Sequence, residues 1–234
     1  MSNKKVPLIL LAGGFGTRLS AVVKDVPKPL APIAGKPFLS YLLENYRKQG
    51  IQHFIFLIHH QAALMKAFVK NEQEIGSLRG CVVSVIEEQQ PMGTGGAVKA
   101  ALKELPEIDT FLVANADTYL SAGVEELLQE KPPLLAAVWQ EDTARYGSMQ
   151  TEGPWITGFA EKAADSGSGL INAGLYHLNA EAFAQMPEQP FSIEKELFPF
   201  LLQKRLLKYA QIGGDFIDIG IPEDYEKCKQ YLTA

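Results

Sequence analysis

The strongest constraint on the fold is an alternation along the sequence between short apolar runs and longer amphipathic segments. The runs are rich in β-branched and aromatic residues, which is typical of βαβ units that build a mainly parallel sheet covered by helices. The runs predicted as strands are Pro7–Ala12, Phe54–Ile58, Val82–Ile86, Thr110–Ala114, Leu134–Trp139, Leu175–Leu178 and Phe216–Ile219. The segments predicted as helices are Phe38–Gln49, Ala62–Lys70, Ala97–Leu105, Val124–Gln129 and Glu223–Leu232.

The length of 234 residues fits one α/β domain with a fully developed core. We therefore predict a single Rossmann-like domain over residues 1–234, with a mixed, mainly parallel sheet flanked by helices. The stretch Thr143–Gly169 is rich in Gly, Ser and charge, and is predicted to form loops and a hairpin. Ligands of open α/β sheets bind beyond the carboxyl ends of the strands, so chemistry is expected in the segments that follow strands.

Composition excludes several classes of protein. With 47% hydrophobic and 21% charged residues, the chain resembles ordinary globular proteins rather than disordered or fibrous ones. A net charge of -5 argues against non-specific nucleic-acid binding, and no apolar stretch approaches the roughly 20 residues of a membrane span. Cys81 and Cys228 form no CxxC pair, which argues against a cysteine zinc site and fits the reducing cytoplasm.

A glycine-rich segment, Leu11–Leu19, follows the first predicted strand. Its glycines would let backbone N–H groups approach a phosphate, and Arg18 and Lys28 add two cations. The dinucleotide fingerprint would require glycine in place of Leu19, and a Walker A loop would require Gly-Lys-Ser/Thr, so both motifs are excluded. A simple turn between strand and helix remains the alternative. The predicted nucleotide-binding residues here are Leu11, Ala12, Gly13, Gly14, Gly16 and Thr17.

Two carboxylates, Asp117 and Asp218, are each expected just after or at the end of a strand. A nucleoside triphosphate is strongly anionic, and Mg²⁺ held by one or two carboxylates and phosphate oxygens is the expected counter-charge. We predict that both aspartates bind Mg²⁺. Either could instead cap a turn or a helix, and their separation along the chain leaves open whether they meet.

A second glycine-rich segment, Glu88–Ala97, lies between a predicted strand and a predicted helix and contains no cation. A flat, neutral ligand such as a nucleobase suits it better than a phosphate. Glu88 could accept the N1–H and N2–H₂ donors of guanine, whereas uracil or thymine would match an ionised carboxylate less well. We therefore predict that Glu88, Gly93 and Thr94 bind the base, with a merely solvated Glu88 as the alternative.

Taken together, the first glycine-rich segment and Lys28-Pro29 resemble the signature of the sugar-phosphate nucleotidylyltransferases. The resemblance extends from Leu8 to about Tyr231, and the later motifs follow in the family's order. They are Gly93-Thr-Gly-Gly-Ala97 for the base, Asn115-Ala-Asp117 and Asp218-Ile-Gly220 for the metal, Glu161-Lys162 for the sugar phosphate, and Asn172-Ala-Gly-Leu-Tyr176 for the sugar. The chain departs from the family pattern at the first metal site. Many relatives have Gly-Asp there, whereas this chain has Asn115-Ala116-Asp117.

The resemblance implies an enzyme that transfers a nucleoside monophosphate from a nucleoside triphosphate to a sugar 1-phosphate and releases pyrophosphate. It implies Mg²⁺ as the cofactor, Arg18 and Lys28 on the pyrophosphate, and Lys162 on the attacking phosphate. Sugar hydroxyls would be bound by Gly147, Glu161 and Asn172. Within the family, three further segments resemble the guanylyltransferases that act on a manno-heptose 1-phosphate for bacterial surface polysaccharide: Arg145-Tyr-Gly147, Phe191-Ser-Ile-Glu194 and the run from Phe216 to Tyr225. This resemblance implies GTP and D-glycero-α-D-manno-heptose 1-phosphate as substrates.

Two alternatives stay open at this stage. The same chemistry could serve uridylyl or thymidylyl transfer to a hexose or amino-sugar 1-phosphate, or the chain could be a nucleotide-binding regulator without turnover. The closing helix lies near the end of the sequence, so a carboxyl-terminal β-helix or regulatory extension is not expected. A homo-oligomer is compatible with the sequence, and no nucleic-acid or membrane partner is expected.

Overall fold

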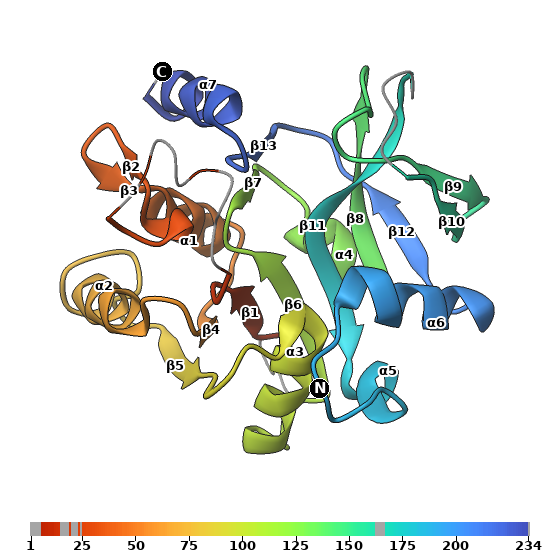
Figure 1. The fold of residues 1–234 in the computed structure, drawn as a ribbon, viewed down its shortest axis with the longest axis horizontal. Coiled ribbons are helices and arrows are strands. Elements are labelled where there is room, and N and C mark those ends of the chain that lie inside the picture. Colours follow the sequence, from red (N-terminus) through yellow and green to blue (C-terminus); the bar gives the residue numbers. More distant parts are fainter. Residues whose placement is uncertain (1–5, 15–18, 20–22, 24, 162–166, 234) are drawn as a thin grey trace. The chain divides into compact units, whose positions relative to one another are not determined.

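The computed structural model describes residues 6–14, 19, 23, 25–161 and 167–233. The chain divides into two compact units. Figure 1 labels their helices and strands. Unit 1 comprises Met1–Pro91, Ala114–Ser121 and Asp215–Ala234, and unit 2 comprises Met92–Val113 and Ala122–Gly214. The assignment of residues 1–234 to a single domain stays a prediction.

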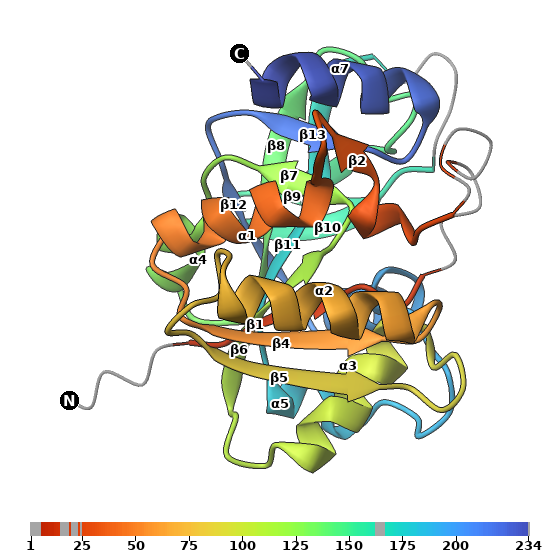
Figure 2. The same ribbon diagram turned by 90° about the vertical axis from the view of Figure 1, so that its left-hand side faces the viewer.

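Three parallel strands form the centre of unit 1, in the order β5-β4-β1. They are β1 (Leu8–Leu11), β4 (His53–Ile58) and β5 (Val82–Glu87). β4 is buried over all residues except its first, as expected for a parallel strand covered on both faces. Helix α2 (Ala62–Glu74) runs alongside β4 and β5 (Figure 2), and helix α1 (Phe38–Lys48) buries seven of its eleven residues.

Short elements complete unit 1. The 3₁₀ turn η1 (Lys28–Leu30) leads into a small hairpin of β2 (Pro32–Ile33) and β3 (Lys36–Pro37). Strand β7 (Thr118–Leu120) pairs antiparallel with β13 (Phe216–Asp218), although almost one hundred residues separate them. Helix α7 (Pro222–Thr233) begins at Pro222, where the fixed φ of proline suits a first helical turn.

Unit 2 holds a mixed sheet whose strands follow the order β11-β8-β12-β10-β9. β11 and β8 pair antiparallel, β12 is parallel to β8, and β10 and β9 form a hairpin. The strands are β8 (Leu134–Gln140), β9 (Met149–Glu152), β10 (Trp155–Phe159), β11 (Gly169–Asn179) and β12 (Lys208–Gln211). Strand β6 (Thr110–Asn115) has its first four residues in unit 2 and its last two in unit 1.

Five helices or helical turns belong to unit 2. Helix α4 packs on β8 and β11, and α5 packs on α3 and β11. A π-helical turn, η2, leads directly into α6. These elements are α3 (Gly93–Glu104), α4 (Val124–Leu128), α5 (Ala180–Ala184), η2 (Ile193–Leu197) and α6 (Phe198–Gln203).

The predicted alternation of strands and helices is confirmed, as is the hairpin within Thr143–Gly169. Three boundaries were wrong by four or more residues. Helix α2 ends at Glu74 rather than Lys70, and α3 begins at Gly93 rather than Ala97. Strand β11 begins at Gly169 rather than Leu175, because its first residues pair with Gln140 and Trp139 of β8.

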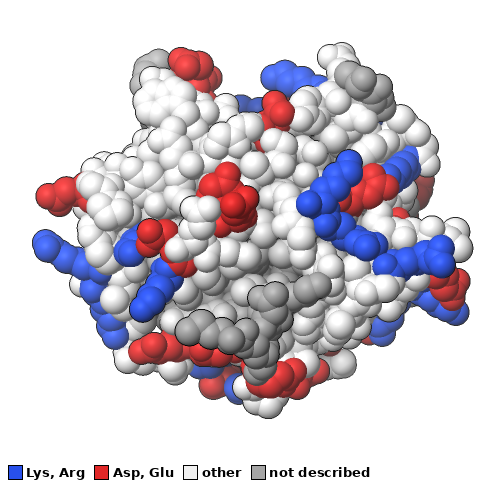
Figure 3. All heavy atoms as spheres, turned by 180° about the vertical axis from the view of Figure 1, so that it is seen from behind, with Lys and Arg blue, Asp and Glu red and all other residues white. Residues whose placement is uncertain are grey.

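Cys81 and Cys228 are both free thiols, and no helix within the described ranges is long and apolar enough to cross a membrane. On the side of the molecule opposite to Figure 1, Lys and Arg side chains lie in small groups beside Asp and Glu (Figure 3). The described residues on that side form no extended cationic surface of the kind that binds nucleic acid without sequence preference.

Candidate active site

The two predicted metal carboxylates come together in unit 1 through the β7–β13 ladder. Asp218 pairs with Thr118, so Asp117 lies one residue beyond the end of the ladder. The N–H of Ile219 donates to the carbonyl of Asp117 at 3.1 Å, and the Thr118 hydroxyl donates to Asp117 Oδ1 at 3.3 Å. The fold therefore brings together two carboxylates that lie about one hundred residues apart in the sequence.

Lys28 bridges the two carboxylates. Its Nζ lies 2.5 Å from Asp117 Oδ2 and 3.7 Å from Asp218 Oδ1. The lysine side chain is 10% exposed, whereas the side chains of Asp117 and Asp218 are 36% and 26% exposed. A mostly buried ammonium thus offsets one of two negative charges that remain open to solvent.

These residues fit a magnesium ion. Mg²⁺ prefers hard oxygen ligands and is commonly bound through one or two carboxylates, while substrate phosphates and waters complete its octahedron. Two partly exposed carboxylates satisfy that requirement. No group of three or more His, Cys, Asp or Glu side chains suited to a metal occurs within the described ranges.

Asp218 also fulfils the structural alternative considered above. Its Oδ1 accepts a hydrogen bond from the Gly220 N–H at 2.7 Å, which forms a local turn. A Cβ at position 220 would lie 2.9 Å from that oxygen, so the Asp218-Ile-Gly220 sequence needs its glycine for the aspartate to turn back on the backbone.

The first glycine-rich segment continues the edge of strand β1. The N–H of Ala12 donates to the Leu57 carbonyl of β4 at 2.9 Å, and the Leu11 carbonyl accepts from Ala116 at 3.3 Å. A Cβ at Gly13 would lie 2.9 Å from Glu88 Oε1, so glycine is required for Glu88 to approach this segment. Gly14 is exposed and has open space around it. The predicted residues Gly16, Thr17 and Arg18 lie outside the described residues.

Glu88 follows β5 in unit 1. Its N–H donates to the carbonyl of Ile58, and its own carbonyl lies 2.9 Å from Nδ1 of His59. These bonds fix the backbone of Glu88 beside the end of β4 while its side chain reaches Gly13. The structure therefore groups Glu88 with the glycine-rich segment, within the same unit as Asp117 and Asp218.

In unit 2, the glycines of α3 surround the backbone of Phe191. The N–H groups of Gly95 and Gly96 donate to the Phe191 carbonyl at 2.9 and 3.2 Å. Gly93 has a φ of +67°, and a Cβ there would lie 2.5 Å from the same carbonyl oxygen. Thr94 Oγ1 accepts from the Ile193 N–H at 2.9 Å. Close packing within the chain thus accounts for these glycines, beside any contact that Gly93 and Thr94 make with a base.

The predicted sugar residue Asn172 lies on β11 at a bulge, four residues before Tyr176. Its Nδ2 donates to the Tyr176 hydroxyl and to Glu194 Oε1, each at 3.1 Å, and its Oδ1 accepts from the Gly174 N–H at 2.9 Å. The Tyr176 hydroxyl in turn donates to Glu194 Oε1 at 3.1 Å. The sequence analysis named these two residues only as ends of motifs, Tyr176 in the sugar motif that begins at Asn172 and Glu194 in the motif that begins at Phe191, and predicted no individual contact for either.

The remaining predicted residues lie near the β9–β10 hairpin. Gly147 is buried, has a φ of +74°, and donates through its N–H to the Thr143 carbonyl at 2.9 Å. Glu161 is exposed and follows β10. Lys162 lies outside the described residues. Unit 2 therefore contains the described sugar candidates, whereas unit 1 contains the metal and phosphate candidates.

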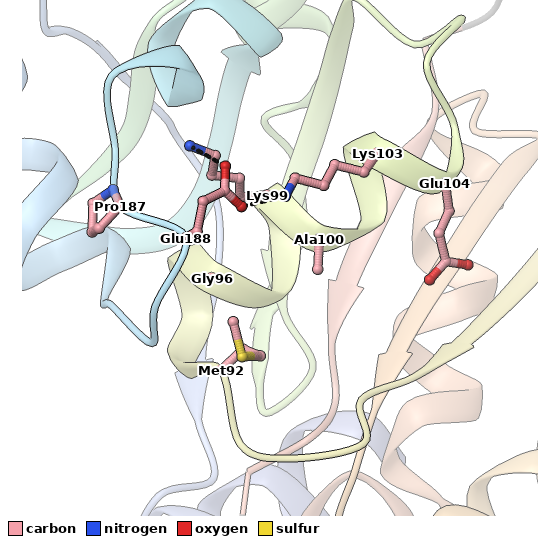
Figure 4. A pocket seen from close by; sticks show the side chains of 8 residues that line it. All are labelled: Met92, Gly96, Lys99, Ala100, Lys103, Glu104, Pro187 and Glu188. Carbon is pink, nitrogen blue, oxygen red and sulfur yellow. Dashed lines mark hydrogen bonds and ion pairs between the residues drawn. The ribbon is translucent and has the colours of Figure 1, made fainter.

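One hollow of about 320 Å³ in unit 2 contains none of the predicted residues (Figure 4). Its charged wall is held together by Glu188, which pairs with Lys99 at 3.1 Å and also with Lys103. The hydrogen bond from Lys103, followed by that from Lys99, lowers the pKa of Glu188. The hollow is lined by Met92, Gly96, Lys99, Ala100, Lys103, Glu104, Pro187 and Glu188.

Comparisons with known proteins give one consistent family. A model of the family described as nucleotidyl transferase matches residues 7–234. The D-glycero-alpha-D-manno-heptose 1-phosphate guanylyltransferase of Campylobacter jejuni is 38% identical over 223 residues, which are 93% of this chain and 96% of that protein. The protein of the same name from Aneurinibacillus thermoaerophilus is 34% identical over 231 residues, which are 96% of this chain and 97% of that protein.

A solved structure is similar over nearly its full length. It is HddC from Yersinia pseudotuberculosis complexed with GMP-PN, with a TM-score of 0.86 and 34% sequence identity. The match covers 97% of this chain and 99% of HddC. This likeness confirms the predicted α/β fold class.

Proposed function

This chain belongs to the nucleotidyl transferase family, and from that premise we propose that it transfers guanosine monophosphate from GTP to D-glycero-α-D-manno-heptose 1-phosphate. The observation that carries the proposal is the Lys28–Asp117–Asp218 cluster, in which two carboxylates open to solvent share one buried ammonium. The substrates are taken from two relatives, both named for this reaction, that match this chain over more than nine-tenths of its length.

In the proposed reaction, an oxygen of the heptose phosphate forms a bond with the α-phosphorus of GTP. The bond from that phosphorus to the bridging oxygen breaks, and pyrophosphate leaves with the electron pair. The attacking phosphate is already ionised at neutral pH, so no general base is required. The protein's contribution is therefore positioning and charge neutralisation.

The chain's own residues divide this work. Asp117 and Asp218 would hold Mg²⁺, which neutralises phosphate charge when it is bound. Lys28 and Arg18 would bind the pyrophosphate oxygens, and Lys162 would hold the attacking phosphate.

Substrate recognition falls to a second group of residues. Glu88 would accept hydrogen bonds from guanine, and the glycine-rich segment would lie along the triphosphate. Gly93 and Thr94 would contact the base, while Gly147, Glu161 and Asn172 would bind the sugar. We place the reaction in the cytoplasm, where free thiols such as Cys81 and Cys228 persist.

A matrix of five nucleoside triphosphates against several sugar 1-phosphates, read by pyrophosphate release with and without Mg²⁺, tests the proposal. We expect the highest kcat/KM for GTP with the heptose phosphate. A preference for UTP or dTTP with a hexose phosphate would favour the alternative transferase. Thermal stabilisation by nucleotide without any product would favour a regulator instead.

The metal assignment is tested by Asp117→Asn and Asp218→Asn. Each should lower kcat by roughly 100-fold or more, because oriented metal and charge stabilisation are among the largest contributions to such reactions. Asp109→Asn is the matched control, since Asp109 is exposed and belongs to none of the proposed sites. Full activity in both site variants would refute the assignment.

A further inference from the structure

The hydrogen bonds around Asn172 leave that amide little capacity for a ligand. An amide side chain has two N–H donors and one carbonyl oxygen. Its Nδ2 lies 3.1 Å from both the Tyr176 hydroxyl and Glu194 Oε1, and its Oδ1 accepts from the Gly174 N–H. The bond from Gly174 also fixes which end of the amide is the oxygen. Both ends of the amide are therefore engaged by protein groups.

Glu194 has the capacity that Asn172 lacks. Its Oε1 accepts from both Asn172 and Tyr176. Its Oε2 has no hydrogen bond to any residue in the described part of the chain. Glu194 is exposed, whereas the Tyr176 side chain is buried and packs edge-on against Phe198 at a centroid distance of 5.2 Å.

The backbone around Glu194 is also fixed. Glu194 is the second residue of η2, whose first turn is capped by Ser192. The Ser192 hydroxyl oxygen accepts from the Lys195 N–H at 3.2 Å, and the Ser192 N–H donates to Glu196 Oε2 at 2.7 Å. These bonds and the two donors on Oε1 hold one carboxylate oxygen in place and present the other to solvent.

We infer that Glu194 is a specificity-determining residue that accepts a hydrogen bond from one sugar hydroxyl through Oε2, and that Asn172 and Tyr176 are positioning residues for its carboxylate. The inference rests on the proposed function and revises its assignment of Asn172 as a direct sugar ligand. An ionised carboxylate is a strong acceptor for a hydroxyl, and an oriented one discriminates against a sugar that lacks the hydroxyl.

The test is steady-state kinetics of Glu194→Gln and Tyr176→Phe with GTP and the heptose 1-phosphate. Glu194→Gln should raise the KM for the sugar phosphate roughly 10- to 100-fold, the range for losing a hydrogen bond to a charged group, and leave the KM for GTP within about twofold. Tyr176→Phe keeps its ring and removes one donor to Oε1, so it should raise the same KM by about fivefold. Glu152→Gln, an exposed residue of β9 in the same unit, is the matched control and should change neither KM.

A second arm separates direct contact from a structural role. Sugar 1-phosphates that each lack one hydroxyl are compared with the parent sugar in wild type and in Glu194→Gln. For the analogue that lacks the contacted hydroxyl, wild type should lose roughly tenfold or more in kcat/KM relative to the parent sugar. Glu194→Gln should show the same kcat/KM with that analogue as with the parent sugar, because the contact is already lost and the two changes are not additive. Equal losses in both proteins for every analogue would overturn the inference and leave the proposed function intact.

The proposed function can fail separately. If wild type releases no pyrophosphate with any sugar 1-phosphate, that function is refuted, and titration calorimetry of the same sugar phosphates then decides the role of Glu194. Weaker binding to Glu194→Gln than to wild type would support the role. Equal binding, or no binding to either protein, would overturn it.

Discussion

At the scale of single residues, the sequence singled out two carboxylates that the fold brings together, but not the residue that they contact. Asp117 and Asp218 could be selected because each follows or ends a strand, where ligands of α/β sheets bind. Lys28 could be selected as a cation near the glycine-rich segment. Its pairing with Asp117, 89 residues away, depends on the fold of unit 1 and could not be derived from local pattern.

That pairing makes a prediction about Lys28. Its ammonium neutralises charge at the two carboxylates, so Lys28→Met should strengthen metal binding in the absence of nucleotide while it lowers turnover. At the separations observed between the Lys28 ammonium and the two carboxylates, removing this unit charge in a partly solvated site should change the free energy of metal binding by on the order of 1 kcal/mol or more. This corresponds to about tenfold in metal affinity. Mn²⁺ binding followed by electron paramagnetic resonance measures the change directly.

A matched control for Lys28→Met is Lys36→Met, which removes a half-buried lysine paired with Glu44 in the same unit. This variant should leave both Mn²⁺ affinity and turnover close to those of wild type. Unchanged or weaker Mn²⁺ binding by Lys28→Met would show that the lysine does not compete with the metal for these carboxylates.

His177 gives a prediction of pH dependence. Its ring is buried, with Nδ1 2.9 Å from the Leu127 carbonyl, and burial lowers its pKa below 6.5, partly opposed by that hydrogen bond. The unfolded chain therefore binds a proton more readily than the folded protein, so the contribution of neutral His177 to stability is complete above about pH 6.5. It is lost as the pH falls from there through the folded-state pKa. In urea unfolding, the difference between wild type and His177→Gln should shrink from pH 7 to pH 5, and a constant difference would contradict this.

At the scale of secondary-structure elements, α3 shows where the sequence was informative and where it was ambiguous. Glycines at 93, 95 and 96 disfavour a helix by propensity, so a loop was predicted up to Ala97. The structure starts the helix at Gly93 because the Phe191 carbonyl accepts from two N–H groups of this first turn. A local propensity was overridden by a contact with a segment about one hundred residues away.

The same contact makes Gly95 intolerant of a side chain. A Cβ there would lie 2.1 Å from the ring of Phe191, which is itself buried. Gly95→Ala should therefore lower the free energy of unfolding by about 1 to 3 kcal/mol, the usual cost of overpacking. Gly213→Ala is the control, because nothing lies within 4 Å of a Cβ at that position. Equal stability of the two variants in urea unfolding would contradict the packing argument, and Phe191→Leu should restore part of the loss in Gly95→Ala.

At the scale of the whole molecule, the fold class followed from the alternation of apolar runs and amphipathic segments. That pattern found β1 and β4, which are largely buried, and β5, whose run of β-branched residues marks it although its side chains are only half-buried or exposed. It did not predict β7 or β12. β7 has only three residues and β12 is partly exposed, so their pairing with β13 and β8 depends on the rest of the chain.

A ligand that binds only the folded protein stabilises the whole molecule, so the proposed substrate and metal predict a change in melting temperature. At a GTP concentration of 100 times its Kd, the gain is about 2.7 kcal/mol, or roughly 5 to 10 °C for a chain of this size. Because Asp117 and Asp218 would bind Mg²⁺ together with the phosphates, EDTA should remove most of this gain. With or without EDTA, the double variant Asp117→Asn/Asp218→Asn should show only the small shift in melting temperature that wild type shows in EDTA.

Differential scanning fluorimetry with GTP and UTP at equal concentrations also tests base preference, because Glu88 as a guanine acceptor requires the larger shift with GTP. Equal shifts with both nucleotides would contradict the guanine assignment, and a shift insensitive to EDTA in wild type would contradict the metal assignment.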